Sequence, residues 1–305
     1  MPLTRNLQAH LSLFGSSLIF GVNYWIAKGM MPVFFDPFQI IFLRLSTAAI
    51  MFWAVSLFFP KEKVLRKDLI LIAICAMLGV VINQILFFEG LQRTKPVETA
   101  ILFTTSPILV LIMSHWLIKE RITTTKSWGI AFGFIGAISI VMNGQVISLA
   151  DTNMLGNLFI IINIISYSLY LVLVKPMMSK YHPMTVMKWV FLFGFIAVIP
   201  IAGPSISKIN WEIITPFIWF SLSYVIIGST FIAYLMITFS LKYLTPSVVG
   251  FYIYLQPFIA TVTGILFYNS TITLVKVFAA LMIFAGVYLV SKNPPRSSIE
   301  MSERY

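Results

Sequence analysis

Ten long apolar stretches follow one another along the chain, separated by short segments that contain charged residues, proline or glycine. A helix of about 20 apolar residues crosses a hydrocarbon layer of roughly 30 Å, and each stretch is about that long. Because a backbone in lipid must satisfy its own hydrogen bonds, we expect helices and exclude open strands. The expected spans are residues 11–29, 38–59, 69–91, 97–118, 128–143, 155–174, 184–202, 217–239, 247–267 and 274–290.

Composition agrees with this pattern. Hydrophobic residues make up 59% of the 305 residues and charged residues only 10%, whereas soluble proteins carry about 25% charged residues. The connections are too short for a sizeable soluble domain. The single cysteine, Cys75, lies within an apolar stretch, and the three histidines form no metal-ligand spacing. We therefore expect an all-α membrane protein of ten transmembrane helices, without metal or cofactor.

The basic residues predict the orientation of these helices. The net charge is +11, but the cations are scattered between apolar stretches, which argues against nucleic acid as a partner and for a lipid bilayer. With the N-terminus inside, 14 Lys and Arg residues lie on the cytoplasmic side and 5 on the other. Because cytoplasmic loops retain basic residues, both termini are predicted to be cytoplasmic.

The second half of the sequence repeats the first at an offset of about 150 residues. The matched positions are Leu91 with Leu241, Pro96 with Pro246, Pro107 with Pro257, Lys126 with Lys276, Gly136 with Gly286 and Asn143 with Asn293. Earlier in the halves the offset is 147 residues, which pairs Lys28 with Lys175. The predicted domains are repeats at 11–144 and 155–291, followed by a short cytoplasmic tail at 292–305.

Five spans per repeat is an odd number, so the second repeat enters the membrane with the opposite orientation. Inverted repeats can exchange two conformations, which opens a central site alternately to either side of the membrane. Spans 128–143 and 274–290 also carry small residues at matching positions, Gly129 and Gly136 against Ala279 and Gly286. These predict close helix packing, either within one chain or in a homodimer.

The chain also resembles the drug/metabolite transporter superfamily, specifically its EamA-type bacterial members. The resemblance rests on Phe20-Gly21-Val22-Asn23-Tyr24-Trp25-Ile26-Ala27-Lys28, Arg44, Ser106-Pro107, Lys119-Glu120-Arg121-Ile122-Thr123, Ala233-Tyr234, Leu241-Lys242-Tyr243, Leu255-Gln256-Pro257 and Gly286-Val287. The second repeat departs from the pattern, with Ser270-Thr271 in place of Glu120-Arg121. The resemblance implies a multi-pass carrier of the cell inner membrane, often an exporter, for amino acids and other small metabolites.

Polar residues inside apolar spans are costly and mark candidate sites. We expect a substrate site lined by Asn23, Asn83, Gln84, Tyr167, Tyr170, Tyr234, Tyr252 and Gln256. Several of these share a helix face, as Asn163, Tyr167 and Tyr170 do. The alternative is that such side chains hydrogen-bond to neighbouring helices, for about 0.6 kcal/mol each.

Gating or coupling is assigned to Arg44, Glu89, Pro107 and Pro257. Each proline lacks an N–H group and interrupts its helix near mid-membrane, where a symmetric pair of breaks points to a central site. Arg44 lies within the second span, where it either reaches the outer interface or pairs with a substrate carboxylate or with Glu89.

These observations favour a secondary transporter of small metabolites that works by alternating access. No phosphate-binding Gly-rich loop is present to drive it with ATP. The alternative is a polytopic intramembrane enzyme or a sensor without transport activity. An enzyme would need a nucleophile with a base or a set of metal ligands, and the histidines have no evident acidic partners.

Overall fold

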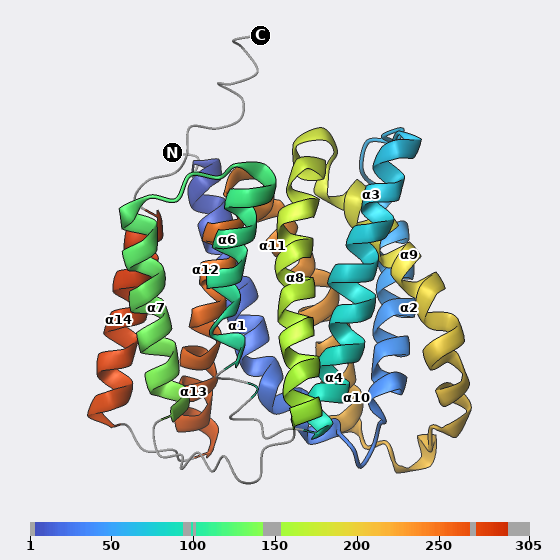
Figure 1. Ribbon diagram of the computed structural model, residues 1–305. Helices are drawn as coiled ribbons and strands as arrows, with labels where there is room; N and C mark the ends of the chain where they lie inside the picture. The colour runs from blue at the N-terminus through green and yellow to red at the C-terminus, as the bar shows by residue number, and fades with distance from the viewer. Residues whose placement is uncertain (1–3, 94–98, 100–101, 143–153, 269–272, 292–305) are drawn as a thin grey trace.

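The computed structural model describes residues 4–93, 99, 102–142, 154–268 and 273–291, which contain helices and turns but no strand. The helices of the first half are α1 (Arg5–Met30), α2 (Pro37–Ser56), α3 (Arg66–Ala76), the π-helical turn η1 (Met77–Ile82), α4 (Asn83–Arg93), α6 (Ser106–Ile118) and α7 (Thr124–Met142). They stand side by side in one bundle (Figure 1).

The second half continues the bundle. Its helices are α8 (Met154–Lys180), α9 (Pro183–Ala202), the 3-10 turns η3 (Gly203–Lys208) and η4 (Trp211–Ile213), α10 (Pro216–Ser223), the π-helical turn η5 (Tyr224–Ile232), α11 (Ala233–Tyr243), α12 (Pro246–Phe251), the 3-10 turn η6 (Tyr252–Tyr254), α13 (Leu255–Tyr268) and α14 (Leu274–Ser291). α1 begins and α14 ends at the upper end of the bundle in Figure 1. We call the opposite end the lower end.

Seven helical runs within the described residues are long and apolar enough to cross a membrane. They are Pro37–Ser56, Arg66–Arg93, Thr124–Met142, Met154–Lys180, Pro183–Lys208, Pro216–Tyr243 and Leu274–Ser291. The expectation of an all-helical membrane protein is therefore confirmed. Where the sequence pattern predicts uninterrupted helices, the third and eighth spans instead contain the π-helical turns η1 and η5.

Prolines and polar caps explain where several helices begin. α2 starts with Pro37 after Asp36, whose side chain accepts from the Phe38 amide at 2.9 Å, while Gln39 accepts from the Asp36 amide at 2.8 Å. This reciprocal pair satisfies two amides that the first helical turn leaves free. A proline in the first turn loses no hydrogen bond, and α6, α9, α10 and α12 also carry one there.

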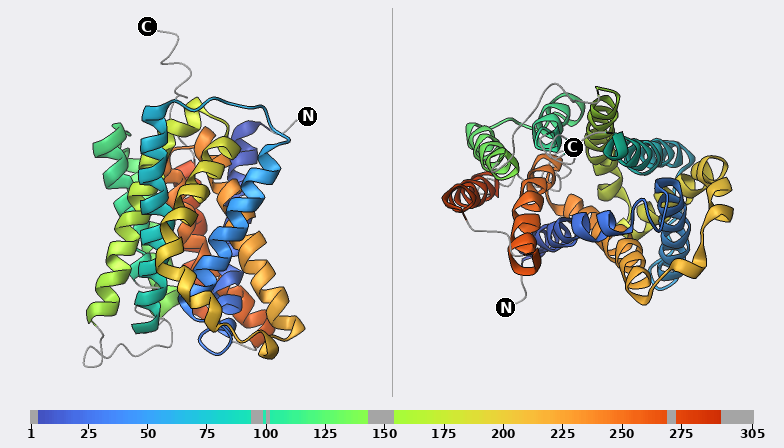
Figure 2. Two further views of the ribbon diagram at one scale, coloured as in Figure 1. Left: turned by 90° about the vertical axis from the view of Figure 1, so that its right-hand side faces the viewer. Right: turned by 90° about the horizontal axis from the view of Figure 1, so that it is seen from below.

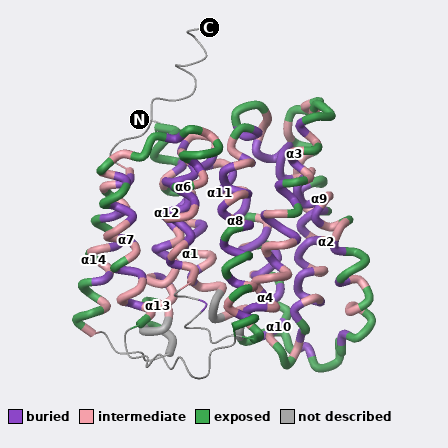
Figure 3. The backbone as a smooth tube through the Cα atoms, in the orientation of Figure 1, coloured by how far each residue is buried: buried purple, intermediate pink, exposed green. Residues whose placement is uncertain are grey.

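The side-chain distribution suits a lipid environment. Large apolar residues lie exposed on the outward faces of the helices, for example Ile50 at 68% and Leu274 at 88% exposed. Polar residues such as Asn163 and Ser229 are fully buried between helices. Figure 3 shows the exposed segments at the periphery and the ends of the bundle. The outer surface is apolar because lipid, rather than water, surrounds it.

Helices from the two halves pack against each other throughout the bundle. α1 packs on α11 and α13, while α8 packs on α4 and α6. α2 packs on α9, and α7 packs on α14 at the opposite edge of the bundle (Figure 2). A methyl group added at Gly286 would lie 2.6 Å from the carbonyl oxygen of Gly129, so α7 and α14 touch through their backbones. The predicted close packing is confirmed, and it occurs within one chain.

Candidate functional site: a polar cavity between the halves

A cavity of about 500 Å³ lies between helices of both halves. Its wall consists of Phe20, Asn23, Ala27, Met31, Pro32, Arg44, Asn83, Gln84, Phe87, Phe88, Leu91, Gln92, Thr99, Phe103, Asn163, Tyr167, Tyr234, Ile253 and Gln256. The cavity reaches the lower end of the bundle, where Pro32 and Gln92 are exposed. Its volume lies within the range of small-molecule sites.

The structure brings together most of the residues that the sequence nominates for substrate binding. Six of the eight line this one cavity, namely Asn23, Asn83, Gln84, Tyr167, Tyr234 and Gln256. Arg44 lines it as well. These side chains come from α1, α2, α4, α8, α11 and α13, so their gathering depends on helix packing across both halves.

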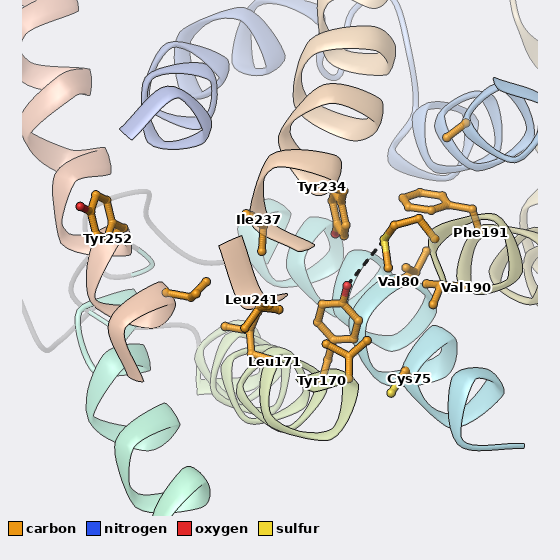
Figure 4. Packing of buried hydrophobic residues seen from close by; sticks show 14 of the residues in the cluster. Cys75, Val80, Tyr170, Leu171, Val190, Phe191, Tyr234, Ile237, Leu241 and Tyr252 are labelled. Atoms are coloured by element: carbon orange, nitrogen blue, oxygen red, sulfur yellow. Dashed lines mark hydrogen bonds between the residues drawn. The ribbon is translucent and has the colours of Figure 1, made fainter. Parts of the chain in front are cut away.

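Two nominated tyrosines lie elsewhere. Tyr170 is fully buried in the apolar core, and its hydroxyl lies 4.0 Å from the sulfur of Met187 (Figure 4). Tyr252 is buried in another part of the same core, away from Tyr170 in Figure 4, and hydrogen-bonds to His10 of α1 at 3.0 Å. Tyr170 shares a helix face with Asn163 and Tyr167, but it lies about one turn further along α8, where its ring packs against Gly79 of η1 instead of lining the cavity.

Unpartnered polar atoms concentrate at the cavity. Among the described residues, twelve buried side-chain atoms lack a hydrogen-bond partner, and five of them belong to the cavity wall. These five are Asn23 Oδ1, Gln84 Nε2, Gln84 Oε1, Thr99 Oγ1 and Asn163 Oδ1. Leaving such an atom unpaired costs about 1–3 kcal/mol, so a cluster of them indicates a place for water or a polar ligand.

Other polar side chains of the apolar spans lie outside the cavity wall and are satisfied by hydrogen bonds within their own helices. Ser16, Thr238 and Thr263 donate to carbonyls one helical turn back, at 2.7–2.9 Å. Such local bonds satisfy a hydroxyl within its own helix and leave it without a role in a site. Sequence reasoning did not single out Thr99, since it follows a polar connection and has no helix-face partner to draw attention to it.

The two π-helical turns adjoin the cavity and were not predicted. η1 ends directly before Asn83 and Gln84, and η5 ends two residues before Tyr234. Shifted by the 150-residue repeat offset, η1 falls within η5. Carbonyl groups in or next to η1 accept hydrogen bonds from the other half of the chain. For example, the Ser166 hydroxyl donates to the Leu78 carbonyl at 2.7 Å. π-helical turns often mark functional sites, and their hydrogen-bond pattern leaves no periodic signal in sequence.

The repeated prolines lie at helix breaks beside the cavity. Pro107 occupies the first turn of α6, directly after a turn at residues 104–105. Pro257 lies in the first turn of α13, after the 3-10 turn η6. Neither proline lines the cavity, but Phe103 and Ile253, four residues before each, both do.

Glu89 also lies outside the cavity wall. It forms an ion pair with Arg93 one turn further along α4, so Arg44 has no partner there. The expected pairing of Arg44 with Glu89 is therefore wrong, because the i,i+4 neighbour on the same helix is closer at hand. Glu98, the other carboxylate near these helix ends, lies outside the described residues.

Hydrogen bonds between the halves close the upper end above the cavity. The Ser17 hydroxyl donates to the Tyr252 carbonyl at 3.1 Å, and the Ser240 hydroxyl donates to the Ala9 carbonyl at 2.8 Å. Together with the bond between His10 and Tyr252, they hold α1 against α11 and η6. The described residues place no comparable set of bonds between α1 and α4 at the lower end.

A half-buried lysine adds to this closure. Lys175 of α8 donates from Nζ to the carbonyls of Leu241, Lys242 and Leu244, at 3.0 Å for Leu244 and 3.4 Å for Lys242. The last carbonyls of α11 have no helical partner and attract a cation. Lys175 therefore fastens α8 to the end of α11, and the cavity is open at one end only.

A helical bundle with an apolar outer surface and a one-sided polar cavity defines the class, a multi-pass membrane transporter. The chain belongs to the EamA-like transporter family, whose profile matches it twice, over residues 7–142 and 154–292. The resemblance to this family is thereby confirmed over nearly the whole length of the protein.

Proteins of similar sequence are also named as transporters. YyaM, an uncharacterized transporter of Bacillus subtilis (strain 168), is 22% identical over 290 residues, which cover 94% of both chains. An uncharacterized transporter of Archaeoglobus fulgidus is 25% identical and covers 94% of this chain and 98% of its own. A crystal structure shares the fold, with a TM-score of 0.75 over 97% of this chain and 16% identity.

Proposed function

We propose that the protein is a secondary carrier that exports small metabolites, such as amino acids, across the cell inner membrane by alternating access. The observation that supports this most is the cavity, which contains unpartnered polar atoms and opens at one end of the bundle only. A channel would need a polar path through both ends. The export direction and the metabolite class rest on the resemblance to the EamA-type carriers.

Two inverted repeats, at 11–144 and 155–291, provide the moving parts in this proposal. Helix packing supports them, because exchanging the halves exchanges the contacts: α1 packs on α11 and α13 as α8 packs on α4 and α6. The π-helical turns and the prolines also occur once per half. Two equivalent halves can exchange conformations, which closes the open end and opens the closed one.

Orientation follows from the proposed ten transmembrane helices. The distribution of basic residues favours cytoplasmic termini and a cytoplasmic 292–305 tail, so we propose that the upper end in Figure 1 faces the cytoplasm. The cavity then faces away from the cytoplasm in this structure. For gating we propose the helix breaks at Pro107 and Pro257, and for coupling we propose Glu89, which forms an ion pair with Arg93.

Flux measurements test the carrier. Purified protein in vesicles should exchange at least one labelled solute from a panel of amino acids, organic acids and amines. Tyr167→Ala and Gln256→Ala, which alter the cavity wall, should reduce that flux at least tenfold. Ser139→Ala is the matched control, because Ser139 is half-buried on α7, lies outside the cavity wall and donates to its own helix at 2.7 Å.

Two results would contradict the proposal. Absence of flux for every solute, with folded protein in the vesicles, would favour the intramembrane enzyme or the sensor. Normal flux in both cavity variants would show that the path lies elsewhere.

A further inference from the structure

A buried cation faces the cavity from α2. Arg44 is 7% exposed, and its Nε donates to the hydroxyl of Thr230 in η5 at 2.8 Å. Thr230 in turn donates to the carbonyl of Val225 at 2.7 Å, which fixes its oxygen as the acceptor for Arg44. The guanidinium also lies 6.0 Å from the ring centre of Phe88. Arg44 is therefore held in place by neutral groups.

The charge of Arg44 is not balanced within the described part of the protein. None of the described carboxylates lies within ion-pair distance of it, and the part of the cavity wall that the structure describes contains no Asp or Glu. Arginine keeps its charge when buried, and an unpaired buried charge is costly. Lys126, the other buried cation among the described residues, is compensated by Glu120 at 2.5 Å. An anion in the cavity would compensate Arg44.

The remaining wall indicates what kind of anion fits. Asn163 donates to the Asn83 carbonyl, which leaves Asn163 Oδ1 as an unpartnered acceptor. The Gln84 carboxamide lies beside the Tyr234 hydroxyl without a hydrogen bond of normal geometry. Most of the other lining residues are aromatic or aliphatic. The site thus combines one cation, a few amide groups and an apolar wall.

We propose that this cavity selects small organic acids, and that Arg44 recognises their carboxylate. A guanidinium matches the two oxygens of a carboxylate, and the Nε bond to Thr230 leaves its terminal amino groups for that contact. The apolar wall would contain the hydrocarbon body of the acid, and the amide oxygens would accept from any donor that it carries. This inference rests on the proposed carrier function, whose solute class it specifies.

A purely structural role for Arg44, as a tie between α2 and η5, predicts something different. Loss of such a tie would weaken the binding of charged and neutral ligands alike. Recognition of a carboxylate predicts a loss confined to acids. Matched acid and amide pairs separate the two roles, because the members of a pair differ in charge and hardly in size.

Equilibrium binding to the purified full chain in lipid nanodiscs provides the test. The probes are four pairs, from acetate and acetamide to 3-phenylpropionate and 3-phenylpropanamide. At least one acid should bind the wild type tenfold or more tightly than its amide. Arg44→Gln should remove this preference while the amide binds as before, and Arg44→Lys should retain part of it.

Lys188→Gln is the matched control, since Lys188 is a half-buried cation of α9 that contacts the Trp53 ring at 4.9 Å, outside the cavity. It should keep the full preference. The proposal is overturned if no acid binds the wild type, if the wild type binds amides as tightly as acids, or if Arg44→Gln keeps the preference. The first two outcomes need no variant to fold.

The same measurements distinguish this proposal from the carrier function. Flux of neutral solutes that depends on Tyr167 and Gln256, without acid binding, would overturn the carboxylate site and leave the carrier intact. Acid binding that depends on Arg44, without flux of any solute, would overturn the carrier function and leave the carboxylate site intact.

Discussion

Replacing Lys175 by methionine should open the upper end of the bundle more often. Lys175 donates to three carbonyls at the end of α11 and thereby fastens α8 to it. Methionine has a similar length and fills the same space, but it has no donor and no charge. The state in which these helices separate loses nothing from the change, since the lysine is hydrated there. The substitution therefore acts on the closed state.

The size of the effect follows from these bonds. A hydrogen bond to a charged group contributes about 1.5–3 kcal/mol, and the bond to the Leu244 carbonyl at 3.0 Å has a normal length. Removing the ammonium group from water offsets part of that gain. A net loss of about 2 kcal/mol remains, which is roughly a 30-fold change in the ratio of open to closed states at about 1.4 kcal/mol per factor of ten.

Cysteine labelling measures this ratio. Cys75 is the only cysteine in the sequence, so Cys75→Ala provides a cysteine-free background. Ser17→Cys then places a thiol at a position that is 2% exposed and bonded across the closed end. Its reaction with a small maleimide requires opening, so its rate should follow the open population. Lys175→Met should accelerate the reaction by about 30-fold.

Lys180→Met is the matched control for this experiment. Lys180 also belongs to α8, but it is half exposed and pairs with Asp68 at 3.1 Å rather than with α11. An exposed pair of this kind contributes less than about 1 kcal/mol, so the labelling rate should change little. An equal rate in Lys175→Met and the background, with both proteins folded, would refute the role of Lys175 in closure.

Two further predictions concern packing and coupling. Gly286→Leu should lower the free energy of unfolding by about 1–3 kcal/mol or more, because its side chain has no room against the Gly129 carbonyl, and thermal unfolding followed by circular dichroism measures this. Gly29→Leu is its control, since nothing lies within 4 Å of the added atom, and equal destabilisation of the two would contradict the packing argument. Glu89→Gln should abolish the dependence of vesicle flux on an imposed pH gradient, because glutamine cannot titrate. Glu62→Gln, at the upper end where Glu62 accepts from the His182 amide, should retain that dependence, and an unchanged dependence in Glu89→Gln would exclude Glu89 as the coupling group.

Helix positions were predictable from sequence to within a few residues. The expected span 69–91 is the observed run Arg66–Arg93, and the span 274–290 is Leu274–Ser291. The first helix was predicted too short, because Arg5 to His10 are polar enough to resemble a tail. In the structure these residues continue α1, where His10 has a partner in Tyr252.

The candidate site was predictable in its chemistry and less so in its geometry. Burying an amide such as Gln84 in an apolar span is costly, so its presence alone indicates a special place. Which polar residues share a cavity is a different question. Tyr167 lines it and Tyr170 does not, and Tyr252 belongs to the closed end.

The sequence by itself determined the class of protein, the helices, the repeat and the polar residues that a site would use. The class, the helices and the polar residues depend on local composition or on spacing along one helix, which hydrophobicity and helix periodicity make visible, and the repeat depends on a nearly constant offset between the two halves. Only the tertiary structure decided that no carboxylate among the described residues pairs with Arg44, that π-helical turns flank the cavity and that Lys175 helps to close one end. These features arise from contacts between residues far apart in the chain, and no local pattern encodes them.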